Sequence, residues 1–205
     1  FPCSTFSIAR FFDADTGEIR DPYAGRPSTA AGTNGDGGPP ILRTDKYADG
    51  LPEDLIDPKH HRELRDSNVL LERTVNIAIA ARRSPSRSTI IFENPADRSI
   101  VDSPCHAPEF ASHGSVFATS PFKRLVAAAD LSSHATFAYC RLDSPYQKYT
   151  SLYYTPEAGS VLDALNGPDF KCNHSRGTHT LQAGGRGSRG EFVSGPAAAY
   201  PAKLN

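Results

Sequence analysis

The stretch HRELRDSNVLLERTVNIAIAARRSPSRSTIIFENP, residues 61–95, decides the fold class of this chain. Its first part predicts a helix over 61–83, because apolar residues recur there at helical spacing. The helix should end before Pro85, since the residue ahead of a proline disfavours helical backbone. The β-branched run over 88–93 then predicts a short buried parallel strand that ends at Glu93. A helix followed by a buried strand indicates an α/β domain.

The second half of the chain continues with similar elements. Its pattern predicts a helix over 121–131 and a strand over 135–140. Residues 151–154 read as the hairpin partner of that strand, and 161–165 as a helical turn. We therefore expect one α/β domain over 1–170.

Loops dilute this folded centre. Only 38% of the 205 residues are apolar, while 16 are glycine and 17 are proline. The interval 13–58 is rich in turn-forming residues, and we interpret it as a loop insertion that is disordered. Residues 171–205 are rich in glycine and arginine and predict a flexible tail.

The net charge and the cysteines narrow the partners and the cellular compartments that we expect for the protein. A formal net charge of −1 gives no global signal for nucleic acid, so a local basic bias has to carry any such interaction. No apolar run approaches the roughly 18 residues that span a bilayer. The four cysteines are widely spread, without a C-x-x-C pair, and no signal peptide is seen. We expect free thiols and an intracellular location, with the nucleus as a candidate.

Two residues carry the strongest chemical signal. Cys3 lies in a Pro-Cys turn, a setting that can lower a thiol pKa and create a nucleophile. The alternative for Cys3 is a plain turn with a small buried thiol. Glu93 closes a buried strand, where desolvation raises a carboxyl pKa and permits proton donation. The alternative for Glu93 is a solvated strand end.

Three short motifs, in order, resemble those of the cytosine-5 DNA methyltransferases. FPCSTFS (1–7) is similar to their Pro-Cys-Gln-x-Phe-Ser loop, and FEN (92–94) to their Glu-Asn-Val strand end. The stretch 142–154 resembles their Pro-Gln-x-Arg-x-Arg segment and the strand behind it. The Pro-Cys loop, together with Glu-Asn-Pro at 93–95 and Gln-Lys-Tyr-Thr at 147–150, also resembles a divergent methyltransferase-like domain of retroelement polyproteins from algae and other protists.

The resemblance implies a Rossmann-like methyltransferase sheet and S-adenosylmethionine as cofactor. Cys3 would attack C6 of a cytosine taken out of the DNA stack, and Glu93 would hold N3 of that base. The resemblance implies further contacts to substrate or DNA from Ser7, Asn94, Gln147 and Lys148.

The chain also departs from this family. Ser4 replaces the family glutamine, and Tyr149 and Ser151 stand where two arginines are expected. The chain has no methionine and opens on the Pro-Cys turn, so we expect a fragment truncated at its N-terminus. The glycine-rich cofactor-binding half of the family is absent, and no cofactor-binding residue is assigned.

The tail adds a local basic signal. Arg186 and Arg189, interleaved with glycine, suit sequence-independent contact with DNA phosphates. A solubilising tail is the alternative.

Other functions stay open at this point. An inactive nucleic-acid-binding or structural module of a mobile-element polyprotein is the main rival to an enzyme. A cysteine hydrolase that pairs Cys3 with His106 is a weaker one. Another set of residues could bind a metal tetrahedrally, but its spacing fits no standard zinc pattern and no metal is assigned; its members are Cys140, Cys172, His174 and His179.

Overall fold

A computed structural model gives the fold of the chain and describes Phe11–Phe12, Ile19–Arg20 and residues 42–108, 114–175, 178–179 and 200–204. Three helices and five strands lie in these residues. The helices are α1 (His61–Arg83), α2 (Ser120–Ala129) and α3 (Gly159–Leu162). The strands are β1 (Phe11–Phe12), β2 (Ile19–Arg20), β3 (Ile91–Pro95), β4 (Ser133–Ala138) and β5 (Tyr149–Tyr154). Short 3₁₀ helices occupy Glu53–Leu55, Pro58–His60, Val116–Ala118, Tyr139–Leu142, Pro156–Ala158, Asp163–Asn166, Pro168–Phe170 and Ala202–Leu204.

The predicted long helix is confirmed with the same bounds. Its buried side chains Leu64, Leu71 and Val75 recur every three to four residues or at twice that interval, so they share one face. Ser84 ends the helix in extended backbone. The predicted second helix is also confirmed, and it begins where the Thr119 hydroxyl accepts a hydrogen bond from the backbone N–H of Phe122.

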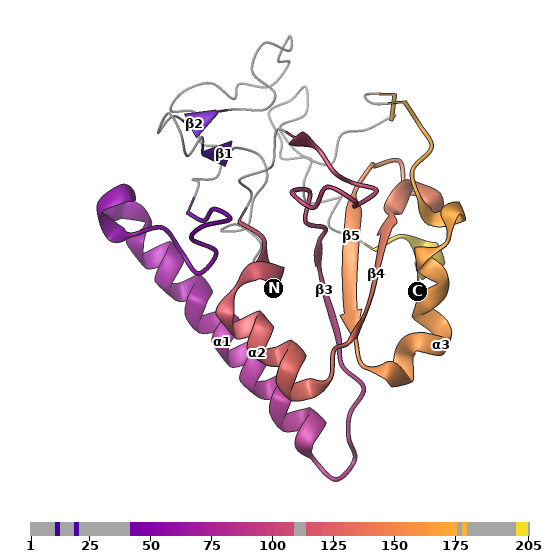
Figure 1. Ribbon diagram of the computed structural model, residues 1–205, viewed down its shortest axis with the longest axis horizontal. Coiled ribbons are helices and arrows are strands. Elements are labelled where there is room, and N and C mark those ends of the chain that lie inside the picture. Colours follow the sequence, from indigo (N-terminus) through magenta and orange to yellow (C-terminus); the bar gives the residue numbers. More distant parts are fainter. Residues whose placement is uncertain are drawn as a thin grey trace.

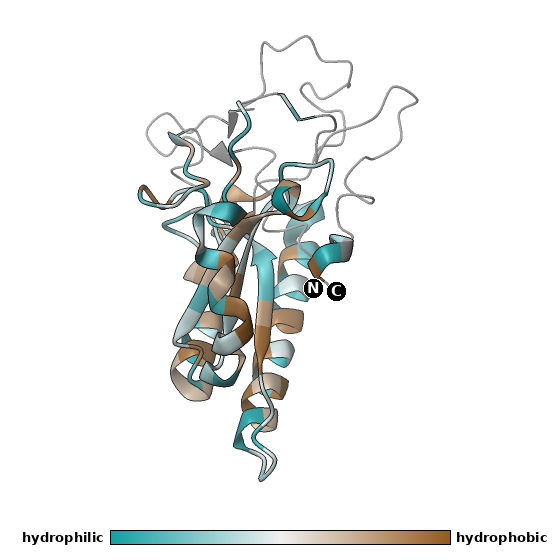
Figure 2. Cartoon of the chain, turned by 90° about the vertical axis from the view of Figure 1, so that its right-hand side faces the viewer, coloured by the Kyte–Doolittle hydropathy of each residue, from teal (hydrophilic) through white to brown (hydrophobic). Residues whose placement is uncertain are grey.

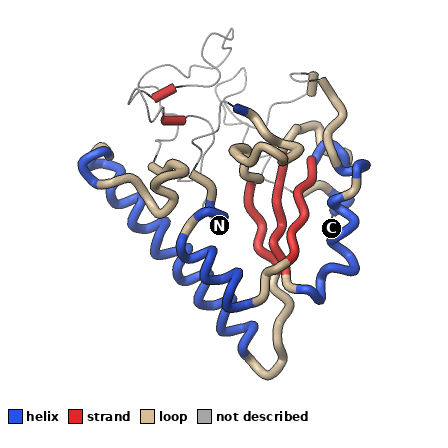
Figure 3. Tube along the Cα trace, in the orientation of Figure 1, coloured by secondary structure: helices blue, strands red, loops and turns tan. Residues whose placement is uncertain are grey.

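The main sheet has the strand order β3-β5-β4, and both pairings are antiparallel (Figures 1 and 3). The predicted hairpin partnership between the strands at 135–140 and 151–154 is confirmed. The predicted parallel strand at 88–93 is wrong in two respects, because β3 begins at Ile91 and pairs antiparallel with β5. The short connection from β4 to β5 forces antiparallel pairing and lets β5 lie beside β3 as well.

This sheet does not match a Rossmann sheet in its strand order or pairing. The coarser expectation holds, since helices and a sheet combine in one mixed α/β arrangement. β3 and β4 are both antiparallel to β5, so they point in the same direction, and the chain passes through α2 between them.

Each face of the sheet has its own core. On one face, Phe92 packs with Leu71 and Val75 of α1 and with Phe122 and Leu125 of α2. On the other face lies a cluster of buried residues from β4, β5 and the chain that follows them: Ala135, Phe137, Tyr139, Leu142, Leu152, Tyr154, Ala158 and Leu165. Figure 1 shows α1 and α2 side by side on one side of the sheet and α3 on the other.

The interval predicted as a loop insertion, 13–58, is described in part. Its portion from residue 42 onward folds as a loop over α1, where Leu42, Leu51 and Ile56 form a small cluster with Leu64. No helix among the described residues is both long and apolar enough to cross a membrane.

Candidate functional site

The predicted site residues that the structure describes gather at one end of the main sheet. β3 and β4 finish there and β5 starts there, because Pro95 and Phe137 both stand opposite Thr150. The backbone N–H of Tyr139 donates to the carbonyl of Lys148 at 2.9 Å and extends the β4–β5 ladder by one step. Figure 2 shows many hydrophilic residues in the loops at this end of the molecule.

Glu93 is the most unusual side chain at this end. The sequence places it at the end of a strand, but β3 continues to Pro95 and Glu93 stands opposite Leu152. Its Oε1 atom is buried and has no hydrogen-bond partner among the residues that the structure describes. Because a buried polar atom without a partner costs free energy, Glu93 calls for an explanation beyond the fold.

Tyr139 lies close to Glu93. Burial raises the pKa of the Tyr139 hydroxyl, and the negative charge of Glu93 adds to this rise. The Thr150 hydroxyl lies near enough to moderate the shift, although the pair does not reach hydrogen-bond geometry. The Tyr139 and Thr150 hydroxyls and Oε1 of Glu93 are thus three buried polar atoms without a hydrogen-bond partner among the described residues.

Asn94 does not join Glu93. Neighbouring residues of a strand point to opposite faces, and Asn94 is buried with 2% of its surface exposed while Glu93 is half-buried. Glu93 lies on the same face of the sheet as Leu152, which is the face toward α3. Asn94 lies on the opposite face, where Phe92 packs against α1 and α2. The two residues predicted to act together are thus separated by the sheet.

Gln147 and Lys148 both make contacts within the protein. The Nε2 amide of Gln147 donates to Sγ of Cys172 at 3.4 Å. The Nζ atom of Lys148 lies 4.6 Å from the centre of the Tyr139 ring, in cation–π geometry. Both side chains stand at the same end of the sheet as Glu93.

A second group of residues meets here, and it contains two thiols and two imidazoles. Cys140 comes from the 3₁₀ helix after β4, whereas Cys172, His174 and His179 follow the 3₁₀ helix at Pro168–Phe170. One ligand atom from each residue lies within 4.8 Å of the other three. We call these four residues the Cys/His cluster.

The distances inside the Cys/His cluster are short. Sγ of Cys172 lies 3.6 Å from Nδ1 of His174 and 3.3 Å from Nε2 of His179. The two imidazole rings meet edge to face, with 4.6 Å between their centres. Such a group of donors could hold a metal ion.

The backbone around the cluster is fixed by contacts with the sheet end. Arg141 donates to the carbonyl of Asp169 at 2.7 Å and to Oδ1 of Asn173 at 2.9 Å. The N–H of Cys172 donates to the Tyr149 hydroxyl at 3.0 Å. These bonds hold the segment around Cys172 against the β4–β5 connection.

Burial shifts the pKa of two members of the Cys/His cluster. Desolvation and the neighbouring Cys172 thiol raise the pKa of Cys140 to about 12. Desolvation and the nearby His174 lower the pKa of His179, which favours the neutral imidazole that binds metals.

Several predicted site residues lie outside the described part of the chain. These are the nucleophile candidate Cys3, the motif residue Ser7, and the tail residues Arg186 and Arg189. The hydrolase alternative shares this limit because it needs Cys3. Its other member, His106, is described, and its Nδ1 is buried without a partner among the described residues.

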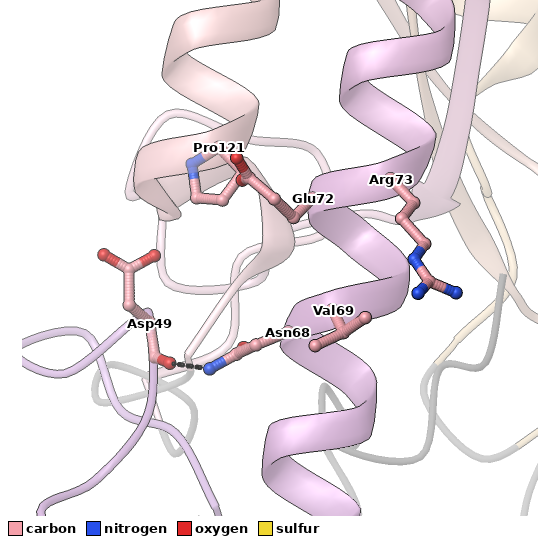
Figure 4. A pocket seen from close by; sticks show the side chains of 6 residues that line it. All are labelled: Asp49, Asn68, Val69, Glu72, Arg73 and Pro121. Atoms are coloured by element: carbon pink, nitrogen blue, oxygen red, sulfur yellow. Dashed lines mark hydrogen bonds between the residues drawn. The ribbon is translucent and has the colours of Figure 1, made fainter.

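A surface pocket between α1 and α2 offers no competing site (Figure 4). Three of its polar side chains, Asp49, Asn68 and Glu72, already serve the fold. The Asp49 carboxylate accepts hydrogen bonds from the N–H and the hydroxyl of Ser120, at 2.8 and 2.6 Å. Glu72 pairs with Arg124 at 2.8 Å, and Asn68 donates to the Asp49 carbonyl at 2.9 Å. The lining is completed by Val69, Arg73 and Pro121.

The Cys/His cluster is the site that the sequence alone does not identify. Its four members can be named as a tetrahedral set, but Cys140 is remote in sequence and the spacing alone does not identify a metal site. Comparison with known proteins gives no further guide, since no family model, no curated protein and no solved structure matches the chain.

Proposed function

We propose that this chain is part of a methyltransferase-like protein that acts on a DNA base, with Glu93 contacting the base. The observation that supports this most is the buried Oε1 of Glu93, which has no hydrogen-bond partner among the described residues. A ligand that offers an N–H or accepts a shared proton would satisfy that atom. N3 of cytosine is such a group when it is protonated.

The direction of the strands also supports this proposal. β3 and β4 point the same way and end at the same place, with β5 antiparallel between them. In parallel α/β sheets, ligands bind at the carboxyl ends of strands that point the same way. The proposal also includes a Rossmann-like sheet. It requires additional parallel strands beside the outer edge of β3, which has no partner strand among the described residues.

The chemistry rests on the resemblance to cytosine-5 methyltransferases. The Cys3 thiolate adds to C6 of a cytosine flipped out of the stack, and Glu93 neutralises the charge that develops at N3. S-adenosylmethionine supplies the methyl group in this family. The described residues contain no glycine-rich turn after a strand that would cradle this cofactor, so we assign none of them to it.

An inactive nucleic-acid-binding module is the second candidate. It is favoured by the contacts of Gln147 with Cys172 and of Lys148 with Tyr139, because both side chains are engaged inside the protein. In this case the chain would bind DNA inside the cell through basic residues such as Arg186 and Arg189, and no base would be modified.

A covalent trap separates these two functions. The chain, joined to the cofactor-binding half that the family carries, is incubated with S-adenosylmethionine and a duplex that contains 5-fluorocytosine, and the adduct is mapped by mass spectrometry. An enzyme gives an adduct at Cys3 that is lost in Cys3→Ser and in Glu93→Gln but kept in the control Cys105→Ser. DNA binding without an adduct identifies the inactive module. An adduct that persists in Cys3→Ser, or no DNA binding at all, overturns the proposal.

A further inference from the structure

We propose that Cys140, Cys172, His174 and His179 form a four-coordinate structural zinc site. None of its four ligands is assigned to the proposed methyltransferase reaction, so the zinc site does not depend on that proposal. Four potential ligand atoms of two chemical types converge within 4.8 Å. Two thiolates and two imidazoles form one of the standard ligand sets of structural zinc.

Two separations within the cluster agree with the edges of a zinc tetrahedron. Zinc lies about 2.3 Å from sulfur and about 2.0–2.1 Å from nitrogen, which puts the two ligand atoms about 3.6 Å apart at the tetrahedral angle. The two sulfur-to-nitrogen distances from Cys172 are 3.6 and 3.3 Å. An ion can therefore contact all three of these residues with little movement of the chain.

The donor set favours zinc over the common alternatives. Calcium and magnesium prefer oxygen ligands, and no carboxylate belongs to the cluster. Thiolate with imidazole suits zinc, and copper(I) shares the preference for thiolate. With four protein ligands the coordination shell is closed, which is typical of a structural rather than a catalytic ion.

Two metal-free interpretations explain less of the geometry. A Cys172–His179 dyad would need one imidazole, yet a second imidazole and a second thiol face the same sulfur region. A Cys140–Cys172 disulfide would use the two sulfurs and leave both imidazoles without a role. Only a shared ion uses all four donors.

Hydrogen bonds from neighbouring residues hold the ligands and their segments in place, as outer-shell residues do in metal sites. The Gln147 amide donates to Sγ of Cys172, a bond that stabilises a thiolate. Arg141, next to Cys140, holds both Asp169 and Asn173 on the opposite segment. The contacts thus connect the two parts of the chain that supply the ligands.

The position of the site indicates its task. Cys140 belongs to the 3₁₀ helix that follows β4, and the other three ligands lie beyond the last 3₁₀ helix of the sheet region. An ion bound there would fasten Cys172, His174 and His179 to Cys140 at this end of the sheet. It would also fix Tyr139, the immediate neighbour of Cys140, beside Glu93.

Metal analysis of the full chain tests this assignment. The protein is purified under reducing conditions, stripped with a chelator and titrated with zinc, and the bound metal is measured by mass spectrometry. We expect one zinc ion per chain. Cobalt(II) as a probe should show the thiolate-to-metal charge-transfer band and the visible spectrum of a tetrahedral ion.

Matched variants locate the ion. Cys140→Ser and Cys172→Ser should lose the charge-transfer band in part and bind zinc at least about tenfold more weakly, whereas Cys105→Ser should behave as the unmodified chain. His174→Asn should weaken binding, with His134→Asn as its control. Gln147→Ala should cost about 10–100-fold in affinity, as removal of an outer-shell partner does.

Three results would overturn the zinc site. One is a stoichiometry far below one ion per chain after reduction, and another is an octahedral cobalt spectrum without a thiolate band. The third is equal loss of zinc in Cys105→Ser and Cys140→Ser. The first two measurements use the unmodified chain, so they decide the question even where a variant does not fold.

Discussion

Arg82, in the last turn of α1, donates through Nη2 to Oε1 of Glu157 at 2.8 Å, although 75 residues separate the two in sequence. The Arg82 side chain is only 5% exposed, whereas 48% of the Glu157 side chain is exposed. This ion pair joins the helix on one face of the sheet to the 3₁₀ helix that follows β5. Arg82 holds the pKa of Glu157 at about 2, well below its ordinary value of 4.5.

The pair predicts an acid-sensitive contribution to stability. Because the pKa of Glu157 is lowered in the folded state, its contribution is complete above about pH 4.5 and is lost as the pH falls toward 2. Glu157→Gln should therefore reduce stability at pH 7 and remove part of the decline in acid. Urea unfolding at pH 7, 4 and 3 measures this. The exposed Asp54→Asn serves as control, and an identical pH profile for both variants would contradict the prediction.

Adjacent leucines of α1 should differ sharply in their effect on stability. Leu71 is 1% exposed and belongs to the core against the sheet, while Leu70 is 43% exposed. Leu71→Ala should lower the free energy of unfolding by about 2–5 kcal/mol, through lost burial and the cavity that remains. Leu70→Ala should change it by roughly 0.5 kcal/mol or less. Chemical denaturation compares the two, and similar losses would show that α1 packs through another face.

The hydroxyl of Tyr154 should contribute a modest amount to stability. It donates to Oδ1 of Asp163 at 2.7 Å, and Tyr154 is fully buried. Tyr154→Phe keeps the ring and removes this bond, and water can reach the exposed Asp163 in its place. We expect a loss of about 0.5–1.5 kcal/mol in thermal or urea unfolding. Tyr47→Phe, at a partly exposed ring, should cost nothing measurable; an equal loss there would contradict the role of the bond.

We expect the Glu93 carboxylate to contribute to adduct formation and not to the stability of the fold. Its buried Oε1 lacks a partner among the described residues, so Glu93→Gln breaks no hydrogen bond of that atom there. We expect an unchanged or higher midpoint of thermal unfolding together with loss of the 5-fluorocytosine adduct. Glu72→Gln is the control for stability, because Glu72 pairs with Arg124 and its loss should not raise the midpoint. A marked fall in stability for Glu93→Gln would show that the carboxylate serves the fold instead.

Local sequence signals predict the helices and the hairpin well. The bounds of α1 follow from helical periodicity and from Pro85, and α2 begins at a Thr-Ser-Pro stretch that favours a helix start. Alternating apolar residues and the intervening turn predict that 151–154 pairs with the strand before it. These signals act over a few residues, where backbone preference and spacing decide the structure.

The pairing of β3 could not be predicted in the same way. A buried apolar strand looks alike whether its neighbour is parallel or antiparallel, and the neighbour of β3 is β5, more than fifty residues later. The sequence pattern also predicts a strand end at Glu93, whereas β3 continues through Asn94 and Pro95.

Residues close together along the chain are enough to specify the helices α1 and α2, the hairpin of β4 and β5, and the chemical types of the residues that could act. The tertiary structure decided which of them meet. It inserted β5 between β3 and β4, so that Glu93 comes to lie beside Tyr139, and it brought Cys140 to Cys172, His174 and His179. The physical reason is that helix and hairpin formation depend on neighbours in sequence, whereas a ligand cluster depends on how distant segments pack against one end of the sheet.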